Sequence, residues 1–300
     1  MKQQSLESGS FEKYRKKTRK EQFLDEMESI IPWKELCQVI KPYYPKAKGA
    51  GRRPIGLDRM LRIHFLQHWF ELSDPAAEEA LYDSRAMRRF VGIDLGKEPV
   101  PDETTILNFR HLMEKHNLGD RLFSLVNTYL AENGLKVNRG TIVDATIINA
   151  QTSTKNKEKK RDPDMHQTRK GNQWYFGMKA NVGVDSKTKL IHSVAVTPAN
   201  VHDSQVLEDL LHGDETRLWG DSAYAGQKHL LYAHAPNAKD YTQKKGCRNR
   251  QLTDNEKSAN KYKSKTRSRV EHIFGVMKLQ FGFRKVCYRG LDKNAHHVFT

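Results

Sequence analysis

The sequence predicts an α/β protein in which a mixed central sheet flanked by helices follows an all-helical N-terminal domain. Between residues 19 and 134, apolar residues recur at helical intervals, whereas β-branched apolar runs typical of strands begin only after residue 136. We therefore expect a flexible basic arm over residues 1–18, a helical domain over 19–135 and a sheet-containing domain over 136–300.

The N-terminal region carries six helical patterns, most with a recognisable start or stop. Pro32 ends the first, over 19–31, and Gly134 is a C-cap signal for the last, over 119–133. The others cover residues 33–40 and 57–70, residues 74–91, and a run that starts at Pro101. Between them, residues 41–55 are basic and broken by prolines and glycines. That segment is either a solvated loop or a linker that contacts phosphates.

The composition favours a polyanionic partner. The chain carries 52 Lys and Arg against 36 Asp and Glu, a net charge of +16, and its pI is near 9.6. No run of 18 apolar residues is present, which predicts no membrane span, and the polar N-terminus lacks a secretion signal. The three cysteines are far apart and show no CxxC spacing, as expected of reduced thiols in a cytoplasm.

A basic helical pattern over residues 257–281 places three charged side chains on one face. At about 100° per residue, Arg267, Glu271 and Lys278 fall within roughly 40° of one another. An apolar stripe beside them can pack on a sheet and consists of Val270, Ile273, Phe274, Met277 and Phe281. Residues 244–289 hold 14 Lys or Arg against 3 Asp or Glu, a net +11. Glu271 is thus either a ligand for a divalent metal or the acid of an ordinary i, i+4 pair with Arg267.

Two aspartates occupy positions where sheets place functional groups. Asp144 lies in the middle of the β-branched segment 140–148, and a buried strand tolerates a carboxylate only with a partner. That partner is a metal ion or a hydrogen-bond donor of the protein. Asp221 follows Gly220 at the end of a short strand, where the backbone can approach closely. Asp221 is either a site residue or the former of a turn.

Further basic and aromatic residues lie between these two aspartates. Residues 151–173 are polar and basic and are predicted to be a long loop over a nucleic-acid groove. Strands are predicted over residues 174–184 and 190–196. Lys179 projects from the first of them, and Trp174 either stacks on an unpaired base or belongs to the core. A helix is then expected after Pro198, with Asp203 as its cap.

The three acids, Asp144, Asp221 and Glu271, follow an order that a ribonuclease-H-like sheet requires. The first lies in a strand, the second at a strand end and the third on a helix, separated by 77 and 50 residues. Three carboxylates that converge in this way can hold two Mg²⁺ ions about 3.5 to 4 Å apart. One ion would activate water or a 3′-hydroxyl, and the other would stabilise the leaving oxygen of a phosphodiester displacement.

The blocks around these acids resemble the catalytic blocks of DDE transposases, closest to the insertion-sequence-five family of bacterial elements. They are VDAT with Asp144, GDSAY with Asp221, and RSRVEHIFGVMK with Glu271. The C-terminal signature of that family is a tyrosine, two residues, Arg, three residues, Glu, six residues and Lys. Arg267, Glu271 and Lys278 match it in register, but Ser264 takes the tyrosine position. The segments LRIHFLQHWF and PDETTILNFRH also resemble the N-terminal domain of the family.

The resemblance implies a Mg²⁺-dependent enzyme, with Mn²⁺ as a substitute, that cleaves DNA at terminal inverted repeats and joins the 3′-hydroxyl ends to target DNA. It implies Asp144, Asp221 and Glu271 as catalytic metal ligands, and at least a homodimer on double-stranded DNA. Residues expected to contact DNA are Arg267, Arg269, Lys278, Lys179 and Trp174. The helical domain would bind DNA or form the dimer, and the protein would act at the bacterial nucleoid in the cytoplasm.

Two other classes remain open from the sequence. A metal-dependent nuclease on the same fold would cut DNA without joining it. A non-catalytic DNA-binding protein derived from a transposase would keep the charge, although it would not need all three acids. The segment NAHHVFT ends the chain without a helix-ending signal, which predicts that a C-terminal helix is cut short.

Overall fold

The computed structural model describes residues 16–46, 53–135, 140–247 and 250–300. Most of the predicted N-terminal arm and the centre of the basic linker, residues 47–52, lie outside these ranges. The chain divides into two compact units, one of residues 1–67 and 72–111 and the other of residues 68–71 and 112–300. Each unit is described by itself. Within the described residues, no helix has the length and apolar character needed to cross a membrane.

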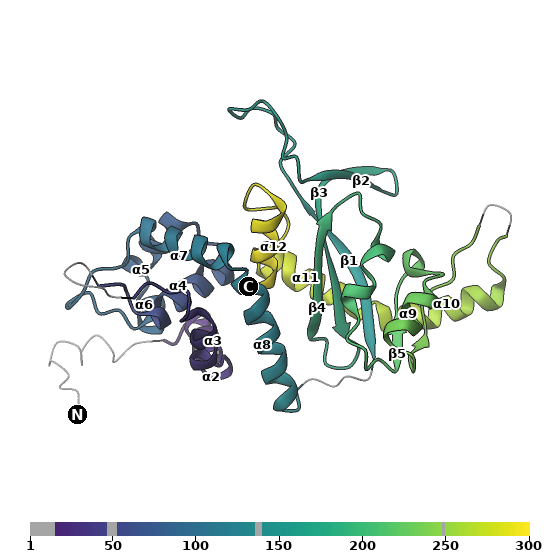
Figure 1. Ribbon diagram of the computed structural model, residues 1–300, viewed down its shortest axis with the longest axis horizontal. Helices are drawn as coiled ribbons and strands as arrows, with labels where there is room; N and C mark the ends of the chain where they lie inside the picture. Colours follow the sequence, from purple (N-terminus) through teal and green to yellow (C-terminus); the bar gives the residue numbers. More distant parts are fainter. Residues whose placement is uncertain (1–15, 47–52, 136–139, 248–249) are drawn as a thin grey trace. The chain divides into compact units, whose positions relative to one another are not determined.

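The described part of the first unit is built from helices (Figure 1). They are α2 (Arg19–Ile30), α3 (Trp33–Ile40), α4 (Leu57–Phe70), α5 (Asp74–Asp83), α6 (Arg85–Val91) and α7 (Glu103–Lys115), the ends of α4 and α7 extending into the second unit. The single helix predicted over residues 74–91 is wrong. Ser84 adopts an extended conformation, and its hydroxyl accepts a bond from Met87 N, so it ends α5 and caps α6.

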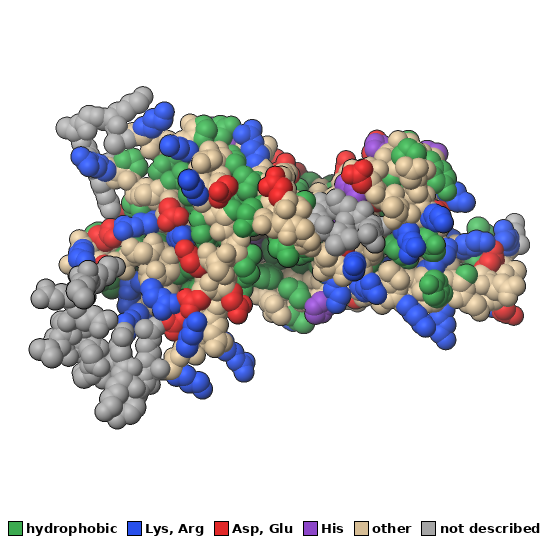
Figure 2. All heavy atoms as spheres, turned by 90° about the horizontal axis from the view of Figure 1, so that it is seen from below, with side chains coloured by type: hydrophobic (Ala, Val, Ile, Leu, Met, Phe, Trp, Pro, Cys, Tyr) green, Lys and Arg blue, Asp and Glu red, His purple; other side chains and the backbone are tan. Residues whose placement is uncertain are grey.

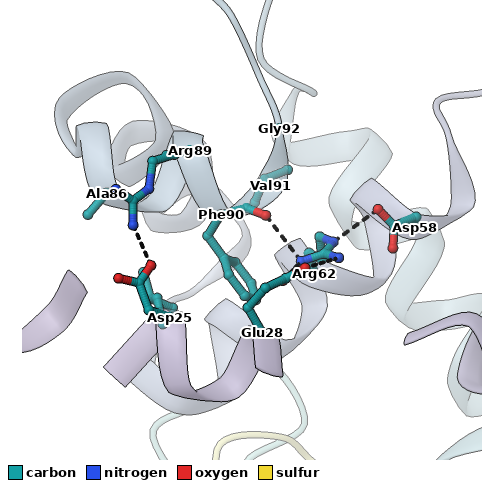
Figure 3. Close-up of a pocket in the computed structure, with 10 residues that line it drawn as sticks. Asp25, Glu28, Asp58, Arg62, Ala86, Arg89, Phe90, Val91 and Gly92 are labelled. Atoms are coloured by element: carbon teal, nitrogen blue, oxygen red, sulfur yellow. Dashed lines mark hydrogen bonds and ion pairs between the residues drawn. The ribbon is translucent and has the colours of Figure 1, made fainter. Parts of the chain in front are cut away.

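Arg62 ties three helices of the first unit together at a pocket of about 340 Å³ (Figure 3). Its side chain is only 10% exposed and donates to Asp58 from the same helix and to Glu28 of α2. It also donates to the carbonyl of Phe90 in α6, and its guanidinium lies 4.4 Å from the centre of the Trp33 ring. Because a buried guanidinium is stable only with such partners, Arg62 holds the unit together rather than presenting charge to solvent.

The second unit contains a six-stranded mixed sheet (Figure 1). Its elements up to the sheet are α8 (Leu118–Glu132), β1 (Thr141–Asn149), β2 (His166–Lys170), β3 (Gln173–Asp185), β4 (Ile191–Pro198), β5 (Arg217–Trp219) and β6 (Lys239–Asp240). The order is β2-β3-β1-β5-β6, with β4 paired to β3. The β1–β3 and β3–β4 pairs are antiparallel, whereas β1–β5 and β5–β6 are parallel. The mixed central sheet predicted from the sequence is thereby confirmed.

Two expectations for this unit are corrected. The stretch 151–173 is not all loop, because β2 pairs with the first residues of β3 in a hairpin. The segment after Pro198 forms two 3₁₀ turns, η1 (Asp203–Val206) and η2 (Glu208–Leu210), instead of a regular helix. The ring of His202 caps the first turn by accepting from Ser204 N, so the prediction that Asp203 is the cap is wrong.

The alternation of side chains along β1 divides the core into two layers. Ile142 and Ile148 face one layer, where they pack with β3 residues and with four buried residues of helix α11 (Arg269–Gln280), namely Val270, Ile273, Phe274 and Met277. Val143 faces the other layer, with residues of η1, η2 and helix α9 (Lys228–His234). The apolar stripe predicted on the C-terminal helix therefore packs on the sheet.

The predicted helix over residues 257–281 is divided at Ser268. Helix α10 (Asp254–Arg267) ends there and α11 begins at the next residue. Ser268 keeps helical dihedrals, but the N–H of Glu271 bonds to its carbonyl over a tight three-residue step, 3.2 Å long. Helix α10 buries none of its residues, whereas α11 buries its apolar face. A last helix, α12 (Leu291–Phe299), follows near the end of the chain.

Candidate active site

Asp144 is set in the central strand β1, and its side chain is 13% exposed. One carboxylate oxygen accepts from Ala145 N at 2.8 Å, and the other pairs with the guanidinium of Arg267. Burial raises the pKa of the carboxyl to about 6, and repulsion from Asp221 and Glu271 adds to the rise, while Ala145 N–H and Arg267 oppose it. Asp221 and Glu271 are thus both close enough to act on the carboxyl of Asp144.

Asp221 lies beside Asp144 because of the strand register. Strand β5 runs parallel to β1 with Trp219 opposite Ile142, so two further residues on each strand bring Asp221 level with Asp144. Asp221 also forms a turn, because its carboxylate accepts from Ala223 N at 2.8 Å and caps the 3₁₀ turn η3 (Ser222–Tyr224). A Cβ at Gly220 would lie 3.1 Å from Val143, which explains the small residue before the acid.

Glu271 lies in the first turn of α11, and its side chain is 61% exposed. The predicted i, i+4 pair exists, with Arg267 Nη1 3.5 Å from Glu271 Oε1. The same guanidinium also pairs with Asp144. Arg267 therefore joins the acid of the strand to the acid of the helix, which an isolated pair on a helix surface would not do.

The donor chemistry of these acids suits a hard divalent cation, because all three supply carboxylate oxygens. Within the described ranges, however, no three His, Cys, Asp or Glu side chains lie close enough together to hold a metal ion as they stand. Arg267 occupies the carboxylate of Asp144. A metal held by these acids would therefore compete with this guanidinium, which pairs with both Asp144 and Glu271.

The predicted DNA contacts differ in where they lie. Lys278 lies within electrostatic range of Glu271, because the pKa of its ammonium is lowered by burial and by Lys170 but raised by Glu271. Arg269 donates to the carbonyl of Ser186, in the turn between β3 and β4, and does not join the acids. The alternative that Trp174 belongs to the core is wrong, because this residue of the β2–β3 hairpin is 64% exposed.

Lys179 has a partner that the sequence did not indicate. Its side chain is 12% exposed, and Nζ donates to Asp203 Oδ1 at 2.7 Å and to the carbonyl of Val201 at 2.8 Å. Asp203, expected to cap a helix, instead neutralises this strand lysine. A lysine in a strand of apolar neighbours, followed 24 residues later by an acid in an irregular segment, offers no periodic signal for the pair.

Tyr224 is a residue that the sequence did not single out. It is buried, and its hydroxyl finds no hydrogen-bond partner within the described residues. Burial raises its pKa, and Asp203, Asp144 and Asp221 raise it further. The hydroxyl therefore lies among the carboxylates, on the turn that Asp221 caps.

An Asp203→Ala variant is expected to lose about 2 to 3 kcal/mol of unfolding free energy, because removing one partner leaves the buried Lys179 ammonium uncompensated. The double variant Lys179→Met/Asp203→Ala should lose less than Asp203→Ala alone. Urea unfolding of the two single variants and the double variant measures the coupling. If Lys179→Met left stability unchanged and instead reduced the salt dependence of DNA binding, Lys179 would be a phosphate contact and not a structural residue.

The sheet and its acids define a class. A mixed sheet with a carboxylate in its central strand, a second at the end of the adjacent parallel strand and a third on a covering helix is a ribonuclease-H-like arrangement. Residues 136–300 match the model of the transposase DDE domain, and residues 12–112 match that of a transposase domain, DUF772. No solved structure matches. The chain belongs to the transposase DDE domain family.

Proposed function

We propose that this chain is a DNA transposase of the insertion-sequence-five family, which binds the terminal inverted repeats of its element, cleaves phosphodiester bonds and joins the 3′-hydroxyl ends to target DNA. The observation that carries the proposal is the grouping of Asp221, Glu271 and Arg267 about Asp144 in a chain whose two parts both match transposase domains. Its strong positive charge supports double-stranded DNA as the partner.

The three acids would hold divalent metal, Mg²⁺ with Mn²⁺ as a substitute, after Arg267 leaves Asp144. Bound there, the metal would supply charge neutralisation at the scissile phosphate and a more acidic attacking hydroxyl. Arg267 is well placed to transfer its guanidinium from Asp144 to a phosphate oxygen, because both acceptors are anionic oxygens. Lys278 would contact a neighbouring phosphate. It lies near Glu271, and repulsion between the ammonium groups of Lys278 and Lys170 would be relieved by a bound anion.

The surface beyond the acids suits a nucleic-acid backbone. Figure 2 shows Lys and Arg side chains gathered at the end of the second unit where α10 lies. Helix α10 is lysine-rich and buries none of its side chains. Trp174 would stack on an unpaired base from the exposed hairpin, and Arg269 would contribute charge beside α11. A synapse of two element ends requires at least a homodimer, with the helical N-terminal domain binding DNA or forming the dimer.

The deciding experiment incubates the wild-type protein with labelled duplex that carries the end of its own element, with Mg²⁺ or with EDTA. We expect Mg²⁺-dependent cleavage and, with pre-cleaved ends, joined product. Cleavage without joining would identify a nuclease instead. Binding to the end without either reaction would identify a DNA-binding protein derived from a transposase.

A further inference from the structure

The segment between β1 and β2, residues 151–165, forms an exposed arm that projects beyond the sheet (Figure 1). We refer to it as the β1–β2 arm. Its lysines are Lys155, Lys157, Lys159 and Lys160, all of them exposed. None of these four ammonium groups forms an ion pair within the described residues. The arm therefore presents four uncompensated charges to solvent.

The turn that carries these lysines has a defined conformation. The Asn156 side chain donates to the carbonyl of Lys160 at 2.6 Å and accepts from the N–H of the same residue at 3.2 Å. Arg161 donates to the carbonyl of Thr152 at 3.0 Å and lies 5.4 Å from the centre of the Phe176 ring in β3. These contacts order the backbone that carries the lysines before any ligand binds, so less loop entropy is lost on binding.

The three acids of the arm all contact residues 289–291, at the start of α12. Asp162 accepts from Gly290 N at 2.7 Å, and Asp164 accepts from Leu291 N at 3.1 Å. Glu158 pairs with Arg289 at 2.5 Å. The charge of Glu158 is therefore balanced by Arg289, whereas Asp162 and Asp164 are hydrogen-bonded to backbone N–H groups and keep their negative charge, which the four lysines outnumber.

These contacts provide the N-terminal cap of α12, which has no capping side chain of its own because its N-cap residue is Gly290. Carboxylates at a helix N-terminus stabilise the unpaired N–H groups and the positive end of the helix dipole. The arm and α12 thus stabilise each other, although about 128 residues separate the partners along the chain.

We infer that the β1–β2 arm is a docking site for the sugar–phosphate backbone of duplex DNA, and that Asp162 and Asp164 are positioning residues that fix it on α12. The inference rests on the proposed function and adds a second region that contacts DNA, at a distance from Asp144, Asp221 and Glu271. It predicts that removing a negative charge from the arm weakens DNA binding, although bulk electrostatics alone would strengthen it.

The first test compares two matched double variants in the full chain, Lys155→Gln/Lys157→Gln in the arm and Lys187→Gln/Lys189→Gln in the turn between β3 and β4. Each removes two exposed lysines at the same spacing. Affinity for a labelled duplex is measured as a function of salt. We expect the arm variant to bind roughly tenfold more weakly and to lower the salt slope by about 1.8, and the control to change affinity less than twofold. Equal losses in both variants would overturn the inference.

The second test compares Asp162→Ala, which removes the acceptor of the Gly290 N–H, with Asp214→Ala, which removes an exposed acid away from the arm. Both raise the net charge by one. The arm variant is expected to bind DNA several-fold more weakly, and the control to bind equally well or slightly better. Tighter DNA binding by Asp162→Ala would overturn the inference that Asp162 positions the arm. Failure of the wild-type protein to bind any duplex would instead overturn the proposed function, so the two failures are distinguishable.

Discussion

A Glu271→Ala variant is expected to retain DNA binding and to lose Mg²⁺-dependent joining by at least about a thousandfold, because a metal ligand in a phosphodiester displacement is worth several kcal/mol of transition-state stabilisation. The Glu271 side chain is largely exposed, and its ion pair with Arg267 is long, at 3.5 Å. Its removal should therefore change the unfolding free energy by less than about 0.5 kcal/mol. Strand transfer of pre-cleaved, labelled ends is the measurement.

The matched control for this experiment is Asp214→Ala, which removes an exposed acid in the same unit. It should join ends at the wild-type rate. Near-normal strand transfer by Glu271→Ala would remove Glu271 from the site. A loss of activity accompanied by a loss of folding, seen as a lower unfolding midpoint, would assign Glu271 a structural role instead.

The metal-free protein is expected to lose stability between about pH 4 and pH 6 through Asp144. The pKa of this carboxyl is 3.8 ordinarily and about 6 in the folded protein. Between these values the folded state binds more protons than the unfolded state, so the unfolding free energy falls as pH rises, and the loss is complete above the folded pKa. A shift of this size corresponds to a contribution on the order of 3 kcal/mol.

Urea unfolding of the wild type and of Asp144→Asn, from pH 4 to pH 8 without metal, isolates this contribution. The variant should gain stability relative to the wild type as pH rises, whatever constant offset the altered contact with Arg267 introduces. Mg²⁺ added at pH 7.5 should stabilise the wild type more than the variant, because under the proposed function it would bind the folded state through this carboxylate. A pH-independent difference between the two proteins would contradict the assigned pKa.

Much of the sheet could be predicted from local pattern. The β-branched run around Asp144 is confirmed as β1, and the short strand before Asp221 as β5. A strand that is buried on both faces has a nearly continuous run of apolar residues, and this run identifies β1 in the sequence. The roles of the acids and the domain boundaries stay predictions. So does the assignment to the insertion-sequence-five family.

Contacts between distant segments could not be predicted. The pairing of Arg267 with Asp144 spans 123 residues, and that of Lys179 with Asp203 depends on an irregular turn. The division at Ser268 could not be predicted, because the helical periodicity of the sequence continues across it. The two helices differ in that α10 has no buried apolar face, whereas α11 has one. The exposed hairpin strand β2 was missed because its residues are polar on both faces.

The distribution of the three acids along the chain has a consequence for synthesis. Asp144 and Asp221 are in place once β1 and β5 pair, but Glu271 joins them only when α11 packs its apolar face on the sheet. A nascent chain that has emerged only as far as η3 already displays the β1–β2 arm and its lysines, yet it lacks the third carboxylate. Under the proposed function, cleavage therefore awaits the synthesis of α11, whereas attraction to nucleic acid does not.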